Sequence, residues 1–344
     1  MELKFQPIWF DSLGAKSSCV LIETDCTILI DPGAAVMHPG FPATREQKLS
    51  WYGEAKQKIR LAARKADVVV VSHYHHDHYT TFDKDIYSGK LLFIKNPNKY
   101  INDSQRSRAE KFFEEFCRSY GLKVEDILEP PEMREFADPM EELEIAGRRT
   151  FGDYQKRREE LLEKGRKWFY DRVRKWCEYK RIPEISLDIE VRFADGMEFK
   201  LGKTRIRFSE PLFHGIEFSR VGWVFSTVIE FKGTRFIHTS DLNGPIIEDY
   251  AEWIIQENPD ILILDGPMTY MLGYTLNLTN FKRAVENAVR IFEETDTEVI
   301  IYDHHLPREP KFRERTREVW EAARKLGKKV LTAAEFLGMK PVVE

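Results

Sequence analysis

Apolar and polar residues alternate along the chain in a way that separates strand-like from helix-like segments. Near the amino terminus, 18–23 and 27–30 are apolar and β-branched, and Thr24-Asp25 between them suits a tight turn. These segments predict an antiparallel hairpin that opens the fold. A helical pattern follows from Ser50, its expected cap, to Ala66. The valine run within 66–72 is typical of a strand buried on both faces.

The pattern changes between about 104 and 182. Long charged stretches there carry apolar residues at intervals of three and four, interrupted by Glu129-Pro130-Pro131 and Asp138-Pro139. We predict a mostly helical insertion over 104–182, with apolar faces that pack together or onto the main body. We expect the whole chain, 1–344, to form a single domain that contains this insertion.

Strand-like segments resume after the insertion and then alternate with helices. The expected strands are 191–193, 204–209, 223–231, 235–239, 261–264 and 298–302, and the expected helices are about 246–256, 281–294 and 311–326. Because both halves of the chain contain strands and helices, the pattern favours an α/β fold with two sheets and helices on their outer faces.

Composition narrows the class of protein. The chain has 344 residues, 42% of them hydrophobic, and a net charge of -4, so it is long enough for a large core and is not basic overall. It contains 4 Cys and no CxxC pair, which argues against a disulfide scaffold and a Cys-ligated zinc site. No apolar run reaches the roughly 18 residues of a membrane helix, and no signal peptide opens the sequence. We therefore expect a soluble, cytoplasmic protein without membrane contact.

Histidine is distributed unevenly. Four of the 9 His fall within the segment His73-Tyr74-His75-His76-Asp77-His78, directly after the predicted valine strand. A sharp loop there would aim His73 and His75 at one metal ion while Asp77 and His78 turn toward a second. Imidazole with carboxylate suits zinc, and also iron or manganese. The alternative is a histidine-rich surface loop with adventitious metal affinity.

Further ligand-type residues follow other predicted strands. His214 comes after 204–209, Asp241 after 235–239, and His304 and His305 after 298–302. Strand ends are where sheet-based active sites collect their side chains, so the shared placement indicates one site.

These motifs resemble those of the metallo-β-lactamase superfamily, an αββα sandwich with a metal site at one edge of its two sheets. The similarity covers about 1–95 and 190–335. It rests on Asp31, the HxHxDH motif at 73–78, His214, Asp241 and the His304-His305 pair. Ser12-Leu13-Gly14, Asp265-Gly266-Pro267 and Asp303-His304-His305-Leu306 are also similar to an uncharacterised, largely archaeal group of this superfamily.

The resemblance implies a ligand set. His73, His75 and His214 would hold the first metal ion, and Asp77, His78 and a terminal histidine the second, with Asp241 bridging. We favour His304 over His305 as that histidine, because it emerges first from the strand. Asp31 would not bind metal but would brace the metal-binding loop.

The resemblance also implies a reaction, a dinuclear metal-dependent hydrolysis in which a metal-bridging hydroxide is the nucleophile and Asp77 and Asp241 orient it. An ester, lactone, thioester or phosphodiester would be cleaved in a small-molecule or phosphodiester substrate. Proton donors considered are His238, His305, His76, Tyr79 and Tyr270. Asp241 stands where antibiotic-hydrolysing lactamases commonly carry Cys, which disfavours antibiotic hydrolysis. His75 replaces the Glu of flavo-diiron oxidoreductases.

Two alternatives remain. Arginine and lysine between Arg148 and Arg181 alternate with Trp168, Tyr170 and Trp176, which would suit a nucleic-acid-processing phosphodiesterase, although acidic residues dilute this charge. The insertion would otherwise serve as a lid or a dimer contact. A mononuclear iron oxidoreductase on the same fold is the alternative from another class of enzyme.

Overall fold

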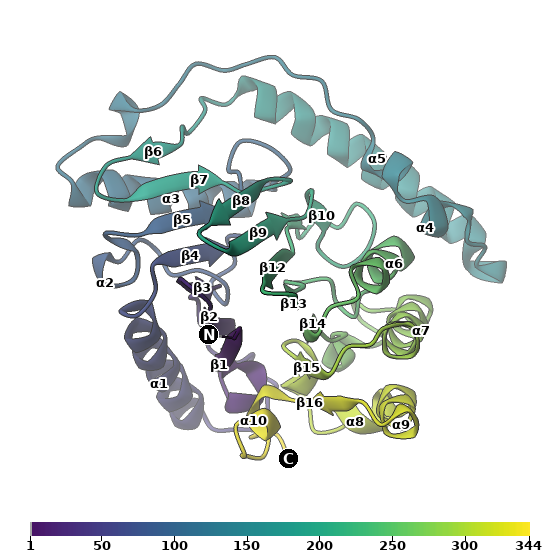
Figure 1. The fold of residues 1–344 in the computed structure, drawn as a ribbon. Helices are drawn as coiled ribbons and strands as arrows, with labels where there is room; N and C mark the ends of the chain where they lie inside the picture. Colours follow the sequence, from purple (N-terminus) through teal and green to yellow (C-terminus); the bar gives the residue numbers. More distant parts are fainter. Residues whose placement is uncertain (1) are drawn as a thin grey trace.

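Two seven-stranded sheets lie face to face, with helices on their outer sides (Figure 1). The computed structural model describes residues 2–344. The first sheet contains, in spatial order, β1 (Lys4–Phe10), β2 (Ser18–Glu23), β3 (Thr27–Ile30), β4 (Val68–Val71), β5 (Leu91–Ile94), β7 (Glu190–Phe193) and β6 (Ile185–Ser186). The second contains β16 (Lys329–Leu331), β15 (Val299–Asp303), β14 (Ile261–Asp265), β13 (Thr234–His238), β12 (Thr227–Phe231), β9 (Thr204–Phe208) and β8 (Glu198–Leu201).

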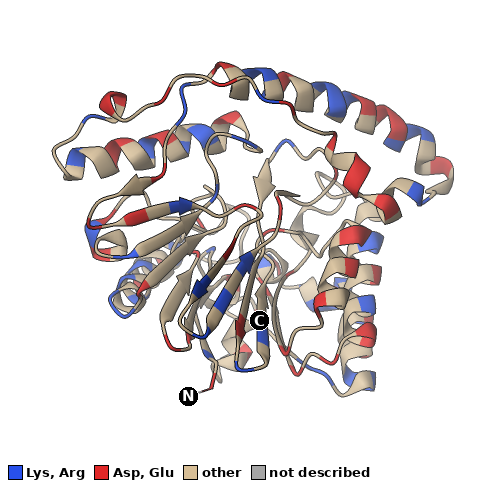
Figure 2. Cartoon of the chain, turned by 45° about the horizontal axis from the view of Figure 1, so that its top comes forward, with Lys and Arg blue, Asp and Glu red and all other residues tan. Residues whose placement is uncertain are grey.

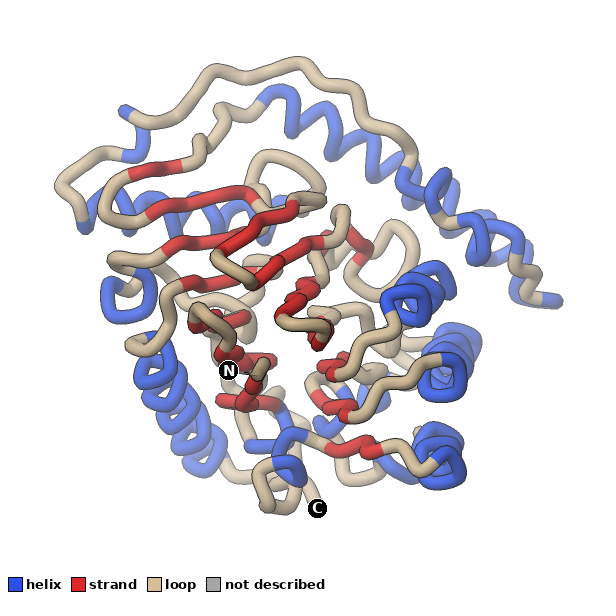
Figure 3. The backbone as a smooth tube through the Cα atoms, viewed as in Figure 1, coloured by secondary structure: helices blue, strands red, loops and turns tan. Residues whose placement is uncertain are grey.

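The helices complete the four layers of an αββα sandwich, as the sequence predicts (Figure 3). Outside the insertion they are α1 (Arg45–Ala63), α2 (Lys84–Tyr87), α6 (Glu248–Glu257), α7 (Leu278–Glu294), α8 (Phe312–Arg315), α9 (Arg317–Leu326) and α10 (Ala333–Phe336). A small ribbon of β10 (Leu212–Phe213) and β11 (Trp223–Val224) stands apart from the two sheets. No helix among residues 2–344 is both long enough and apolar enough to cross a membrane.

Strand β4 shows why the sheets stack. Val68 and Val70 face the other sheet and pack with Ile229 and Ile263, while alternate residues Val69 and Val71 face the helices of the outer layer. A strand buried on both sides needs apolar residues at every position, which explains the uninterrupted valine run. The predicted burial of this strand and the hairpin of β2 and β3 are confirmed.

Several predicted boundaries are wrong. Helix α1 begins at Arg45 rather than Ser50, because Thr44 and Gln47 form a capping box, and it ends at Ala63. The expected strand 223–231 is two strands, because the chain changes partner near Phe225, whose N–H donates to Ser72 O of the other sheet. The expected helix 311–326 breaks at Thr316, whose hydroxyl donates to the Phe312 carbonyl.

The segment predicted as a helical insertion contains α3 (Asp103–Ser119), α4 (Glu144–Arg148) and α5 (Gln155–Glu178). An extended stretch between α3 and α4 runs beside α5 (Figure 1). Asn98 Nδ2 donates to Ile182 O at 2.8 Å, so the two ends of the segment lie next to each other. The description of 1–344 as one domain with 104–182 inserted remains a prediction.

Candidate metal centre

Strand ends of both sheets bring the predicted ligands to one edge of the sandwich. β3 and β4 are parallel neighbours in the first sheet, and β13, β14 and β15 are parallel neighbours in the second. His73 follows β4, Asp241 follows β13 and His304 follows β15. Since parallel strands end at the same edge, side chains more than 200 positions apart in the sequence meet there.

The loop that carries the HxHxDH motif is a single tight turn. His78 and Tyr79 donate their N–H groups to the His75 carbonyl at 2.8 and 3.0 Å. Gly33 lies directly against this turn, and a Cβ atom there would stand 2.3 Å from Tyr79 N and 2.5 Å from His78 N. Only glycine permits that approach, so Gly33 belongs to the structure of the site.

The ligand-type atoms form three groups, of which one consists of Asp241, His304 and His305. In the other two, His73, His75, His214 and Asp241 offer atoms that all lie within 4.8 Å of one another, and so do Asp77, His78 and His304. Asp241 Oδ2 is 2.9 Å from His214 Nε2 and 3.4 Å from His73 Nε2. Its Oδ1 is 2.9 Å from His78 Nε2 and 3.2 Å from His304 Nε2. Asp241 therefore lies between the groups, where the sequence places a bridging ligand.

Buried polar atoms indicate that the two groups fit metal ions. His73 Nε2, His214 Nε2 and Asp241 Oδ1 have no hydrogen-bond partner within the described part of the chain. His78 Nε2 and His304 Nε2 face each other at 3.1 Å, and both lie close to Asp241 Oδ1. A divalent ion in each group would satisfy these atoms, and imidazole with carboxylate is a donor set that binds such ions.

Three carboxylates each contact the Nδ1 atom of one histidine, on the side of the ring that faces away from the cluster. His78 Nδ1 donates to Asp31 at 2.8 Å, His304 Nδ1 lies 3.2 Å from Asp11, and His305 Nδ1 lies 2.8 Å from Asp265. With Nδ1 engaged, each ring directs Nε2 toward the cluster. The sequence predicts this role for Asp31 alone. Asp11 and Asp265 were missed as orienting groups, although each stands at the end of a strand.

Hydrogen bonds orient two imidazoles of the first group, those of His73 and His214. His73 Nδ1 lies 3.1 Å from Ser72 Oγ, which itself donates to Asp31 at 2.7 Å. The Asn243 amide lies 3.3 Å from His214 Nδ1, while Asn243 Oδ1 is buried without a partner in residues 2–344. Turning that amide over would let Oδ1 accept from His214 Nδ1–H, which leaves Nε2 free to bind metal.

The imidazoles of the centre differ in pKa because their charged neighbours differ. Burial and the charge of His78 lower the pKa of His73 to about 4, so His73 is neutral, as a metal ligand must be. Burial alone lowers the pKa of His78, but the carboxylates of Asp241 and Asp31 outweigh it and raise the pKa to about 10. In the metal-free protein the His78 ring therefore carries a proton on both nitrogens, and its positive charge lies between the carboxylates of Asp241 and Asp31.

The structure separates the candidate proton donors. His305 Nε2 is 3.9 Å from Asp241 Oδ2, so this ring borders the cluster. His238 Nε2 lies 2.9 Å from Ser18 O, and its Nδ1 accepts from Ser240 N–H at 3.2 Å. Because both nitrogens of His238 have protein partners, we no longer propose it as a proton donor. His76 stacks on Tyr79 at 5.4 Å and joins neither group.

The insertion contacts two of the loops that carry ligands. Gln105 of α3 accepts a hydrogen bond from Tyr74 N at 3.4 Å and donates to Val221 O at 2.9 Å. Tyr74 lies between His73 and His75, and Val221 lies in the loop that follows His214. Gln105 therefore ties together the two loops of the first ligand group.

A buried ion-pair network makes a second connection from the insertion to the His214 loop. Glu217 pairs with Arg158 of α5 at 3.0 Å and with Arg283 of α7 at 2.8 Å. The Phe151 ring lies under both guanidinium groups. Although burial acts to raise it, the pKa of Glu217 is held below its ordinary value by Arg283 and Arg158. Removing only one partner of such a buried ion pair lowers the free energy of unfolding, because the other charge stays buried without a partner.

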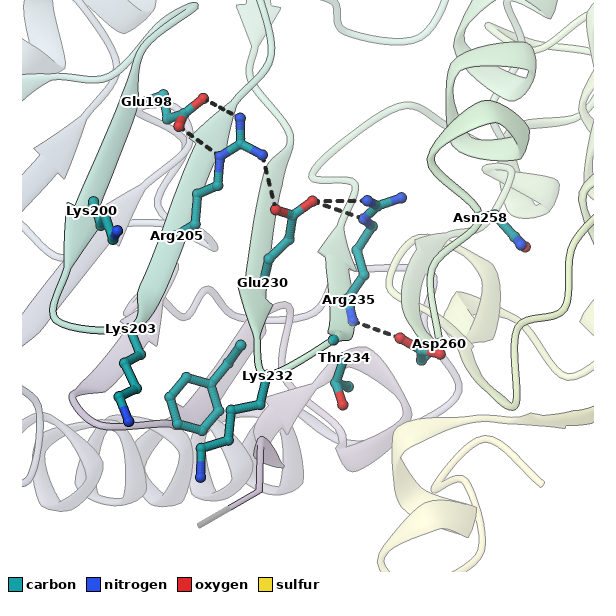
Figure 4. Close-up of a pocket in the computed structure, with 12 residues that line it drawn as sticks. Glu198, Lys200, Lys203, Arg205, Glu230, Lys232, Thr234, Arg235, Asn258 and Asp260 are labelled. Atoms are coloured by element: carbon teal, nitrogen blue, oxygen red, sulfur yellow. Dashed lines mark hydrogen bonds and ion pairs between the residues drawn. The ribbon is translucent and has the colours of Figure 1, made fainter.

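A charged groove of about 650 Å³ lies away from the cluster (Figure 4). Arg205 there pairs with Glu198 and Glu230, on the face of the second sheet opposite its buried isoleucines. The groove includes the turn at Lys232-Gly233, whereas Asp241 follows the other end of β13. It is therefore separate from the candidate centre.

Comparison with known proteins agrees with this fold and site. The sequence profile of the metallo-β-lactamase superfamily matches residues 14–84, which include the HxHxDH motif. The chain is a metallo-β-lactamase-fold protein with a cluster of histidine and aspartate typical of di-metal sites in that superfamily.

Within that superfamily, the chain belongs to the uncharacterised UPF0282 family, as its motifs predict. It is 31% identical to a UPF0282 protein of Methanopyrus kandleri over 353 residues, covering 98% of this chain and 94% of that protein. It is also 31% identical to one of Methanocaldococcus jannaschii over 351 residues, covering 98% and 92% of the two chains.

Solved structures are similar only distantly. Human tRNase Z, short form, is 12% identical with a TM-score of 0.40, covering 88% of this chain and 92% of its own. CmlA, a diiron β-hydroxylase from Streptomyces venezuelae, is 12% identical with a TM-score of 0.41, covering 92% and 51%. Neither similarity indicates the reaction of this chain.

Proposed function

We propose that this protein is a dinuclear metal-dependent hydrolase that cleaves an ester-type bond. The observation that carries the proposal is the position of Asp241 between two groups of imidazole and carboxylate ligands. This donor set favours zinc, with manganese or ferrous iron as alternatives. When bound, such ions supply an activated water and polarise the bond under attack. A phosphodiester, a carboxylic ester or lactone, and a thioester are the candidate bonds.

The proposed roles follow the two groups. His73, His75 and His214 would hold the first ion, Asp77, His78 and His304 would hold the second, and Asp241 would serve both. Asp77 and Asp241 also orient the water. Asp11 and Asp31 keep His304 and His78 in the tautomer that binds metal.

We propose His305 as the residue that moves the proton. Its Nδ1 is engaged by Asp265, and its Nε2 points to the edge of the cluster. Burial and the charge of Arg308 hold the pKa of His305 well below its usual value, so the ring is neutral in the metal-free protein and would release a proton readily once it had taken one up. Burial and the charge of Asp241 raise the pKa of Asp265, so His305 would hold the proton only briefly before it passes to the leaving group.

Chelation tests the proposal. Metal-stripped protein is expected to lose activity on model phosphodiesters, esters and thioesters and to regain it with zinc, manganese or iron. Asp241→Asn is expected to lower both metal content and activity, the latter about 100-fold or more. Asp153→Asn, an exposed change in the insertion, is the matched control. Full activity of the stripped protein would refute the metal mechanism.

The insertion offers little support for a nucleic-acid-processing enzyme. Trp168 stacks on Trp223 at 5.4 Å and Trp176 is buried, so these aromatic rings belong to the core. Blue Lys or Arg positions and red Asp or Glu positions are interspersed along the ribbon of α5 (Figure 2). Most of its basic residues have acidic partners, including Arg157, Arg158, Arg166, Lys167, Arg172, Arg174 and Lys175. We therefore propose a small-molecule ester as substrate before a nucleic acid.

Metal analysis distinguishes the remaining class of enzyme. Two ions per chain would agree with the hydrolase, since both groups of ligands are complete. A single iron ion per chain, together with consumption of dioxygen during turnover, would instead support a mononuclear iron oxidoreductase.

A further inference from the structure

Asp77 is one of the partly exposed ligand-type residues of the metal centre. The side chains of His73, His78 and Asp241 are at most 1% exposed, whereas the side chain of Asp77 is 15% exposed. His75 is the other partly exposed member of the two groups. The residues beside Asp77 therefore border one approach to the centre.

Four residues, which we call the rim, stand on that side: Lys16, His38, Tyr270 and Arg308. Arg308 Nη2 lies 3.4 Å from Asp77 Oδ2, and Arg308 Nη1 donates to the Tyr270 hydroxyl at 3.3 Å. The His38 ring stacks on Tyr270 at 4.7 Å, and its Nε2 lies 3.2 Å from the Arg308 carbonyl. The rim thus joins three loops into one wall next to a metal ligand.

Lys16 is held in this wall by its backbone. Its N–H and carbonyl both pair with Ala35 at 2.9 Å, and the carbonyl of the next residue, Ser17, lies 3.1 Å from His304 Nδ1. Burial and the positive charge of Arg308 lower the pKa of Lys16, while Asp77 and Asp11 act to raise it. The backbone contacts place Lys16 on the loop that borders His304, and its pKa responds to the charges of Arg308, Asp77 and Asp11.

Lys16 differs from the neighbouring cations in its partners. Arg308 pairs with Asp11 and Asp77, and Lys48 donates to the carbonyls of His38 and Pro39 at 3.0 Å. Lys16 forms no ion pair or side-chain hydrogen bond with any residue in 2–344, although it is only partly exposed. A half-buried ammonium group without a counter-ion favours an anion from outside the chain.

We propose that Lys16, supported by the rest of the rim, binds an anionic group of the substrate at the opening of the metal centre. The inference rests on the proposed function and narrows its substrate class to esters that carry a phosphoryl or carboxylate charge next to the cleaved bond. Two divalent ions behind Asp77 would add to the positive potential of this opening.

Calorimetric binding to zinc-loaded protein tests the inference without any reaction. The probes are inorganic phosphate, acetate and, as an uncharged metal ligand, imidazole. Lys16→Met is expected to weaken phosphate or acetate binding about tenfold and to leave imidazole binding and zinc content unchanged. Lys16→Arg is expected to retain most of the affinity. Lys58→Met, on the exposed face of α1, is the control variant.

The two anions distinguish the possible groups. A loss confined to phosphate supports a phosphoryl ester, a loss confined to acetate supports a carboxylate, and both are expected to weaken as salt concentration rises. Equal anion affinity in Lys16→Met and the parent protein would overturn the inference. Failure of the hydrolase assays with intact, Lys16-dependent anion binding would instead reject the proposed reaction.

Discussion

Individual carboxylates determine the orientation and the tautomer of the imidazoles in the centre. Asp31, Asp11 and Asp265 each engage the Nδ1 of one histidine, so the tautomer is set before any ligand arrives. Asp241 instead faces the cluster, where its two oxygens approach different groups. Aspartate thus serves both as a ligand and as an orienting group, and only position in the fold separates these roles.

Zinc affinity is expected to rise with pH. The pKa of His78 in the metal-free protein is raised to about 10, so its ring keeps a proton that zinc must displace. Competition titrations from about pH 6 to pH 8 are expected to show tighter binding at the higher pH, with release of protons in calorimetry. Affinity that is independent of pH, with no proton release, would show that His78 is not displaced by the ion.

Replacement of Gly33 by alanine is expected to disrupt the HxHxDH turn. The added Cβ atom would meet backbone atoms of His78 and Tyr79, which cannot move aside as a flexible side chain does. Thermal melts are expected to show destabilisation by about 2 kcal/mol or more, together with reduced zinc content.

Gly53→Ala provides the opposite control. Gly53 lies within α1, and a Cβ atom there meets nothing within 4 Å. Alanine at this position is expected to stabilise the protein by about 0.5–1 kcal/mol and to leave zinc content unchanged. If both glycine variants behaved alike, close packing at Gly33 would not be the cause.

At the scale of elements, α3 and α5 brace the loops of the first ligand group. Gln105 links the turn at Tyr74 to the His214 loop, and Arg158 holds Glu217 in that same loop. The second ligand group contains Asp77, His78 and His304, and its orienting carboxylates, Asp31 and Asp11, both follow strands of the first sheet. The two groups therefore depend on different parts of the fold.

Gln105→Ala is expected to weaken one metal site selectively. Its loss releases Val221 from the His73 turn, so affinity for the ion held by His73, His75 and His214 is expected to fall about tenfold, while the second ion binds as before. Cobalt titration followed by absorbance would resolve the two binding steps. Lys111→Ala on the exposed side of α3 is the control, and equal weakening of both steps would contradict a local brace.

At the scale of the molecule, the inserted segment covers apolar surface of the main body. Trp223 and Phe213 of the small ribbon are fully buried, and Trp223 contacts the rings of Trp168 and Trp176 from α5. Gly165 of α5 also packs directly against Phe218. These contacts indicate a structural part of the fold rather than a mobile lid.

Removal of the insertion tests this reading. Since Asn98 and Ile182 are adjacent, a short glycine-serine linker could replace 104–182. The shortened chain is expected to lose its cooperative thermal transition and bind hydrophobic dye, because Trp223 and Phe213 become exposed. A cooperative melt with full zinc content would show that the insertion is a separable appendage.

Local features of the sequence predicted much of the fold. The valine strand, the β2–β3 hairpin and the alternation of helices and strands after 240 follow from periodicity, which depends on neighbouring residues. Strand β1 and the cap of α1 were missed. β1 completes an edge of the first sheet, and Thr44 precedes the apolar pattern that marked the helix. Each boundary depends on a contact outside the periodic segment.

The sequence by itself determined the kinds of ligand and their places at strand ends, because HxHxDH is a short local motif and the other ligands follow recognisable strands. Only the tertiary structure decided that His304 joins His78 while His305 turns to Asp265, and that Asp11 supports a histidine 293 positions away. It also decided that Asp77 and His75 are partly exposed while His73, His78 and Asp241 are buried. These facts depend on how two sheets pack, and packing brings together residues whose separation along the chain carries no local signal.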